Sequence, residues 1–223
     1  MEAGTSSGRD PATGRLADHE HGQAPGQATE PTGGHWKVAD PGPLGLAAFA
    51  LTTFVLSMFN SGILDARAEP IVFGLAFAYG GLAQLLAGMW EFRTGNTFGA
   101  VAFTSYGAFW LSFWAFEAFY AKSVPEAVTG QAVGVYLVAW GVFTSYMFIA
   151  SLRTTAAVAL VFVLLAVTFL LLGIGEWSGT SGLAKAGGFF GLATAAAAWY
   201  ASFAAVTNST FGRTVLPVKP LNG

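Results

Sequence analysis

The feature that most constrains this chain is a series of six long apolar segments joined by short polar connections. The segments cover residues 44–64, 71–90, 97–120, 131–151, 155–174 and 184–206. Each approaches the length of about 20 residues that an α-helix needs to cross a hydrocarbon core of about 30 Å. The segments are continuous runs, not short alternating ones, and this disfavours strands. The sequence therefore predicts an all-α membrane protein with six transmembrane helices in a lipid bilayer.

The composition agrees with this fold and excludes several classes of function. Hydrophobic residues make up 54% of the chain and charged residues only 10%, whereas about 25% are charged in soluble domains. A net charge of −2 gives no electrostatic reason to expect nucleic acid as a partner. There is no cysteine, and the three histidines all lie within the first 35 residues. We therefore expect no metal site and no cofactor within the membrane.

The chain divides into three parts. Residues 1–39 are rich in Gly, Pro, Ala, Ser and Thr, and such a composition predicts a disordered tail. Residues 40–212 form the six-helix transmembrane domain, and residues 213–223 form a short C-terminal tail. If the N-terminus is cytoplasmic, five basic residues flank the inner ends of the helices and three flank the outer ends. This bias favours both termini inside, with both tails cytoplasmic.

Small residues recur every four positions on several predicted helices. Examples are Gly80 and Gly88, with Gln84 between them, and Gly187 with Gly191. This spacing lets helix backbones approach closely. We expect mainly contacts within one subunit, but contacts between subunits and space for a solute remain alternatives.

A short repeat, FTSY, occurs at residues 103–106 and again at 143–146. The two copies lie on antiparallel helices and are expected at similar depth, and Gln84 falls at the same level. Isolated hydroxyls often bond to their own helix, but a buried glutamine amide and a buried tyrosine need other partners. This polar layer is therefore either structural or part of a solute route.

The middle of each segment lacks acidic and basic side chains. Rings of charge that would select a cation or hold an anion permanently are therefore absent. Hydroxyl and amide donors among aromatic rings suit a small, weakly bound anion or its neutral acid. At the start of the first segment, Asp40 is expected to cap the helix and Pro41 suits its first turn.

Four stretches of the chain resemble the acetate uptake transporter family, also called the succinate–acetate permease family. DPGPLGLAAFALTT, from Asp40, resembles the family signature Asn-Pro-x-Pro-Leu-Gly-Leu, and residues 79–110 resemble its most specific stretch. GVYLVAWGVFTSYMF and FGRTVLPV are also similar. The resemblance extends over residues 40–218. Asp40 departs from it, because the family has Asn there, and a carboxylate at the cytoplasmic mouth would repel acetate unless it is protonated or serves as a cap.

The resemblance implies a homo-hexamer in the plasma membrane with one pore in each six-helix subunit. It implies transport of acetate and related short carboxylates, including succinate in some members, through a channel or together with protons. It also implies a constriction built by Phe49, Tyr106 and Leu165, the last of these matched by counting along a gapless helix. We assign five polar residues to the substrate pathway: Asn60, Gln84, Thr104, Ser105 and Thr144. We assign three to the pore mouth: Asp40, Glu91 and Asn96.

Alternatives remain open at this point. Glu91 is either a pore-mouth acid or an interfacial partner of Arg93. A hydroxyl-lined, uncharged pore would also admit ammonium or another small uncharged solute. A membrane sensor would need a signalling domain, which neither tail supplies. An enzyme is not expected, since no His, Cys, Asp or Lys lies in mid-membrane to act as a base for Ser or Tyr.

Overall fold

The computed structural model describes residues 38–221. The predicted disordered tail, except its last two residues, and all three histidines lie outside the described residues. The described part is helical, and its one β-type contact is an isolated bridge between Thr155 and Pro220.

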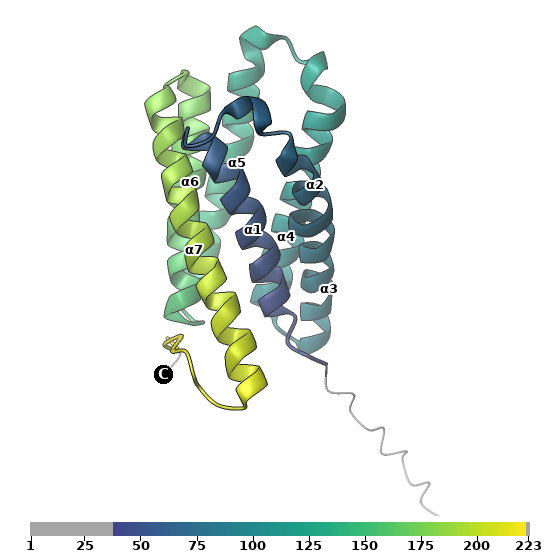
Figure 1. Ribbon diagram of the computed structural model, residues 1–223, viewed down its shortest axis with the longest axis vertical. Helices are drawn as coiled ribbons and strands as arrows, with labels where there is room; N and C mark the ends of the chain where they lie inside the picture. Colours follow the sequence, from purple (N-terminus) through teal and green to yellow (C-terminus); the bar gives the residue numbers. More distant parts are fainter. Residues whose placement is uncertain (1–37, 222–223) are drawn as a thin grey trace, which may run out of the picture. The chain divides into compact units, whose positions relative to one another are not determined.

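Six helical rods run through the structure, as predicted (Figure 1). Their α-helices are α1 (Gly42–Asn60), α2 (Ile71–Phe77), α3 (Gln84–Thr94), α4 (Thr97–Ala115), α5 (Glu126–Ser151), α6 (Ala156–Ser178) and α7 (Ser181–Phe211). The π-helical segment η2 (Ala78–Ala83) joins α2 and α3 into one rod, and a second, η3 (Phe116–Tyr120), extends α4.

Five of the rods are long and apolar enough to cross a membrane, and α4 runs alongside them in the same bundle. The helix α4 has a lower mean hydropathy because it carries the first FTSY repeat, two tryptophans and one further serine. The chain is therefore a multi-pass membrane protein.

Local sequence sets the ends of the helices. The Asn96 side chain accepts a hydrogen bond from the Gly99 amide at 3.1 Å and so caps α4. Thr155 caps α6 in the same way through the Val158 amide. Gly95, between α3 and α4, has a φ of 79°, a left-handed conformation that favours glycine.

Close contacts at small residues hold the helices together. A Cβ atom placed at Gly107 of α4 would lie 2.6 Å from the Leu85 backbone nitrogen of α3, and one at Gly134 of α5 would lie 2.8 Å from the Gly173 carbonyl oxygen of α6. Gly191 of α7 lies against Ser57 of α1. The small-residue spacing therefore marks packing within one subunit. In contrast, the backbones of α4 and α5 come close at few positions, and aromatic side chains such as Phe109 and Tyr136 pack in the interval.

The segment after α7 folds back onto the turn between α5 and α6. The Tyr200 hydroxyl donates to the Pro217 carbonyl oxygen at 2.6 Å, and the Ala156 amide donates to the Lys219 carbonyl oxygen at 2.8 Å. We call this end of the bundle, where α1 begins and α7 ends, the terminal end (Figure 1). The other end, where α1 and α6 finish, is the opposite end.

Candidate functional site

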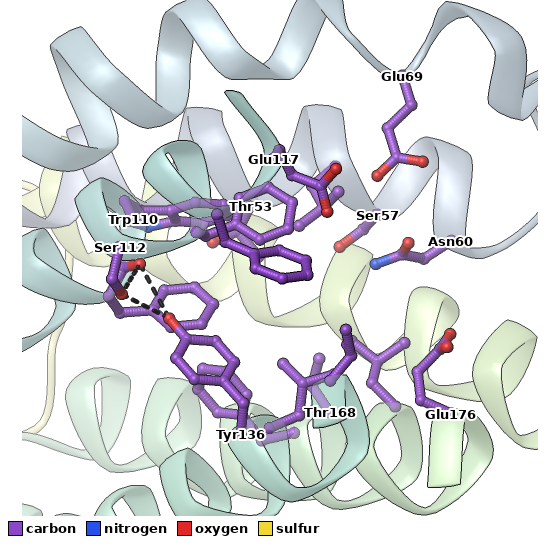
Figure 2. Close-up of a pocket in the computed structure, with 18 of the residues that line it drawn as sticks. Thr53, Ser57, Asn60, Glu69, Trp110, Ser112, Glu117, Tyr136, Thr168 and Glu176 are labelled. Carbon is purple, nitrogen blue, oxygen red and sulfur yellow. Dashed lines mark hydrogen bonds between the residues drawn. The ribbon is translucent and has the colours of Figure 1, made fainter. Parts of the chain in front are cut away.

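A cavity of about 560 Å³ lies among α1, α4, α5 and α6 and extends toward the opposite end (Figure 2). Its walls are mostly aromatic and aliphatic. Hydroxyl and amide groups come from Thr53, Ser57, Asn60, Ser112, Thr129, Tyr136 and Thr168. Its acidic residues are Glu69, Glu117 and Glu176, and no Lys, Arg or His is among the described residues that line it.

The cavity ends toward the middle of the bundle on the three residues that the resemblance assigned to a constriction. Phe49 and Leu165 line it directly, and Tyr106 packs behind them in the same buried cluster. The three side chains are only 3–4% exposed. The ring centroids of Phe49 and Tyr106 are 5.8 Å apart. The structure thus joins residues from α1, α4 and α6 into one apolar barrier.

Tyr106 is held by a residue of the second FTSY repeat. Its hydroxyl lies 2.9 Å from Oγ1 of Thr144, and Thr144 Oγ1 lies 2.7 Å from the Trp140 carbonyl oxygen. A threonine hydroxyl has one proton, and the carbonyl can only accept, so the Tyr106 hydroxyl donates to Thr144. Any further hydrogen-bond acceptor near Tyr106 would therefore compete with Thr144 for this donor.

Beyond Phe49, Tyr106 and Leu165, toward the terminal end, the bundle is closed by apolar side chains. Phe98 of α4 packs on Phe162 of α6 with ring centroids 5.1 Å apart. Leu46, Val101 and Val158 pack against the same cluster. We call the Phe98–Phe162 contact the terminal plug. The cavity therefore reaches Phe49 and Leu165 from the opposite end only.

Gln84 and Thr104 lie on the other side of α4, away from the cavity wall. Thr104 meets Gly88 of α3, and Gln84 shares that face of α3 and is 1% exposed. Neither the Gln84 amide nor the Thr104 hydroxyl has a hydrogen-bond partner in the described part of the chain.

The single polar layer expected from the sequence is therefore two groups at similar depth. Leu85, the neighbour of Gln84, packs on Gly107, the neighbour of Tyr106. Gln84 and Tyr106 therefore lie at similar depth in the bundle. Thr104 and Tyr106 lie on different faces of α4 because residues two apart on a helix point in nearly opposite directions. Ser105 is half-buried and does not line the cavity, whereas Asn60 does.

The mouth of the cavity is acidic. Glu69, in the connection before α2, is partly buried, and burial raises the pKa of its carboxyl above the usual range, with repulsion from Glu117 and Glu176 adding to the rise. Figure 2 shows Glu69 and Glu117 beside Asn60 and Ser57. A neutral or singly charged mouth would admit a carboxylate more easily than a fully ionised one.

The three residues assigned to the pore mouth, Asp40, Glu91 and Asn96, meet at the terminal end. Asp40 Oδ1 accepts from the Gly42 amide at 2.9 Å, so it caps the start of α1 as expected. Glu91 is 1% exposed, and its Oε2 accepts from the Thr94 hydroxyl at 3.1 Å.

The alternative pairing of Glu91 with Arg93 is wrong. The ion pair formed within residues 38–221 joins Arg67 to Asp65. Residues two apart on a helix do not face each other, and Arg93 is exposed whereas Glu91 is buried.

Several cavity residues were missed from the sequence. Thr53 and Ser57 follow Phe49 on α1 at four-residue steps, and Asn60 completes the same face. This helical spacing was the available signal. No comparable pattern marks Tyr136 and Thr168, whose hydroxyls enter the walls from α5 and α6.

Several proteins with similar sequences carry transport names. Acetate permease A of Emericella nidulans is 46% identical over 197 residues, which cover 82% of this chain and 66% of the permease. This chain therefore spans slightly less than two thirds of that fungal relative. The succinate-acetate/proton symporter SatP of Escherichia coli K12 is 42% identical over 83% of this chain and 97% of the symporter. Ammonia transport outward protein 2 of Saccharomyces cerevisiae is 44% identical over 82% of this chain and 65% of that protein.

The fold also has a solved counterpart. The structure of the bacterial acetate channel SatP superimposes with a TM-score of 0.77 at 42% identity, covering 82% of this chain and 99% of that one. The sequence model of the GPR1/FUN34/yaaH family matches residues 23–223. With nearly the whole membrane domain matched in sequence and in fold, the chain belongs to the GPR1/FUN34/yaaH family.

Proposed function

We propose that this chain is a membrane pore for acetate and related short-chain carboxylates, with succinate as a larger candidate substrate. The observation that carries the proposal is the cavity without basic residues that ends on Phe49, Leu165 and Tyr106. The names of the symporter and channel relatives support the same substrate class. We infer no catalytic step and no cofactor.

The chemistry of the cavity suits a weakly held solute. A basic residue would bind a carboxylate tightly and slow its release, whereas hydroxyls replace its water molecules one at a time. At the apolar constriction an anion loses hydration at a cost of several kcal/mol. Passing the neutral acid, or an anion accompanied by a proton, lowers this cost. We therefore propose that protons accompany the substrate.

Within this pore we propose that Asn60 and Thr144 belong to the substrate pathway, together with the constriction. Asn60 offers an amide at the cavity mouth, and Thr144 bonds Tyr106. Asp40, Glu91 and Asn96 form the mouth at the terminal end.

A second candidate solute is ammonia or ammonium. The ammonia transport relative from yeast favours it, and an uncharged pore lined by hydroxyls would not exclude it. Competition separates the two candidates: excess ammonium should leave uptake of labelled acetate unchanged if the carboxylate is the substrate.

The proposed orientation has both termini in the cytoplasm of a plasma-membrane protein. Single cysteines replacing Glu69 or Ser178, at the opposite end, should then react with an impermeant thiol reagent added outside intact cells. A cysteine replacing Arg153, at the terminal end, should not react. Labelling of the Arg153→Cys variant alone would reverse the orientation.

We propose that six subunits assemble, each with its own cavity. One side of α5 exposes large apolar residues to lipid or to a neighbouring subunit: Val128, Val135, Val142, Tyr146 and Ile149. Native mass spectrometry should give a particle of six chains. A protein that is monomeric in mild detergent and that transports acetate as a monomer in proteoliposomes would contradict the assembly.

The proposal is tested by counterflow of labelled acetate into proteoliposomes, with protein-free liposomes subtracted. Wild-type protein should exchange acetate, and a pH gradient should drive its accumulation if protons are coupled. Phe49→Ala should widen the constriction and raise the ratio of succinate to acetate exchange. Phe203→Ala, which truncates an exposed phenylalanine of α7, is the matched control and should leave that ratio unchanged. Exchange no faster than in protein-free liposomes would refute the function.

A further inference from the structure

A buried carboxylate without a countercharge lies at the terminal end. Glu91 is 1% exposed, and its Oε1 has no hydrogen-bond partner within residues 38–221. No Lys or Arg in that part of the chain forms an ion pair with it. An ionised carboxylate in such a place costs several kcal/mol, whereas the neutral acid costs far less.

The unpartnered oxygen points at the start of α4. A Cβ atom placed at Gly99 would lie only 2.6 Å from Glu91 Oε1, so this glycine makes room for the carboxyl. A Cβ at Gly42, in the first turn of α1, would lie 3.4 Å from the same oxygen. The first turns of two helices thus converge on one carboxyl group. The positive ends of helix dipoles attract an anion at this position.

The first turn of α4 also carries the terminal plug. Phe98 precedes Gly99 and packs on Phe162 at 5.1 Å between ring centroids. Any force that holds or releases the start of α4 therefore acts on Phe98. The cavity reaches Phe49 and Leu165 from the opposite end, so this plug is the apolar closure on the terminal side of the constriction.

We propose that Glu91 binds a proton and thereby controls the terminal plug. As a carboxylate, Glu91 is attracted to the first turns of α1 and α4 and keeps Phe98 against Phe162. When a proton adds to a carboxylate oxygen, the negative charge is lost and this attraction falls. The start of α4 is then free to move and to open the plug. Glu91 is a positioning residue that acts through Phe98, and the inference rests on the proposed transport function.

One like charge and two neutral polar side chains surround Glu91. The one titratable group that faces it from the segment before α1 is Asp40, a like charge whose Oδ1 lies near Gly42. The start of α4 contributes only the neutral Asn96, and its own helix contributes the neutral donor Thr94. Asp40 opposes the anionic form of Glu91, whereas the first turns of α1 and α4 favour that form.

The test is acetate counterflow at equal pH inside and outside, from pH 5 to pH 7.5. The test compares wild type with Glu91→Gln after subtraction of the flux in protein-free liposomes. The matched control is Glu126→Gln, which replaces an exposed carboxyl at the start of α5. Glutamine keeps the shape of the protonated acid. The ratio of Glu91→Gln to wild-type flux should therefore rise with pH, because only wild type closes its plug as Glu91 ionises. The Glu126→Gln ratio should stay near one.

Acetate and the cavity glutamates ionise in the same way in all the proteins. Their effect on the flux therefore cancels when the ratio of variant to wild-type flux is taken at each pH. A Glu91→Gln ratio that is constant with pH would overturn the proposal. If that variant does not fold, Phe98→Ala decides, because removing the plug should abolish the same pH dependence. Wild-type pH dependence in Phe98→Ala would refute the coupling.

Failure of transport itself is distinguishable from failure of this inference. Infrared difference spectra between pH 5 and pH 7.5 report a protonated carboxyl whether or not the protein transports acetate. Wild type should show a carboxylic acid band that is missing in Glu91→Gln. Identical spectra for the two proteins would remove Glu91 as the proton site even if acetate exchange is normal.

Discussion

The two sides of α4 differ in a way that composition does not reveal. The side toward α5 and α6 borders a cavity, and its hydroxyls have partners: Tyr106 bonds Thr144, and Ser112 lies 2.7 Å from the Tyr136 hydroxyl. The side toward α3 is closed by glycine contacts, yet Thr104 there lacks a partner. Unmet hydrogen-bonding capacity occurs on both sides, because Thr53 Oγ1 and Trp110 Nε1 at the cavity also lack a partner in the described part of the chain. Polarity alone does not locate the route.

The side of α4 toward α3, which we call the closed side, should lose more stability than the cavity side when a residue is enlarged. Gly107→Ala places a methyl group 2.6 Å from the Leu85 backbone nitrogen, and backbone gives way poorly. We expect a loss of about 1–3 kcal/mol in stability from overpacking. Gly182→Ala, where nothing lies within 4 Å, is the control and should cost nothing. Thermal unfolding in detergent measures both, and equal melting temperatures would show that α3 and α4 are not tightly packed.

The side of α4 toward α5 and α6, which borders the cavity and which we call the open side, should be the side on which losing a hydrogen bond slows transport more. Tyr106→Phe removes the donor nearest the constriction, and we expect acetate exchange to fall about tenfold, since an unreplaced hydrogen bond costs about 1–3 kcal/mol. Gln84→Leu, on the closed side, should change exchange less than about twofold if Gln84 is outside the route. The reverse order of effects in counterflow assays would move the route to the α3 side.

A smaller effect is expected at the cavity mouth. Burial raises the pKa of Glu69, and repulsion from Glu117 and Glu176 adds to the rise. The carboxyl is thus neutral below its raised pKa and becomes negative as pH increases through it, which repels the anion. Glu69→Gln should therefore raise exchange about two- to threefold above that pKa and little below it, as suits a charge effect under about 1 kcal/mol. If Glu69→Gln raised acetate exchange most at low pH, the proposed repulsion by the ionised Glu69 would be contradicted.

The sequence was a good guide to the helices and to the grouping of Phe49, Tyr106 and Leu165 in one buried cluster. Six apolar runs predicted six rods, and Leu165 could be placed by counting because α6 is continuous. The family resemblance supplied the pairing of Phe49 with Tyr106, which no local pattern contains. Long apolar runs and unbroken helices are features that a linear sequence records directly.

The sequence was a poor guide to the faces of helices and to the cavity mouth. The π-helical turn η2 shifts the phase of the rod just before Gln84, so counting from α2 does not give its face. Glu69, Glu117 and Glu176 come from three segment ends and meet only through the fold. Glu91 looked like a surface acid because Arg93 is near it in sequence, and its burial depends on Gly99 of the next helix.

The most direct test of the account asks which side of α4 carries the solute. The chain has no cysteine, so single thiols can be introduced without removing others. Ser57→Cys places a thiol in the cavity wall, and Thr104→Cys places one on the closed side. A small charged thiol reagent should block acetate exchange by Ser57→Cys, acetate should slow this block, and exchange by Thr104→Cys should be unaffected. Block of Thr104→Cys with acetate protection, and none of Ser57→Cys, would contradict the account.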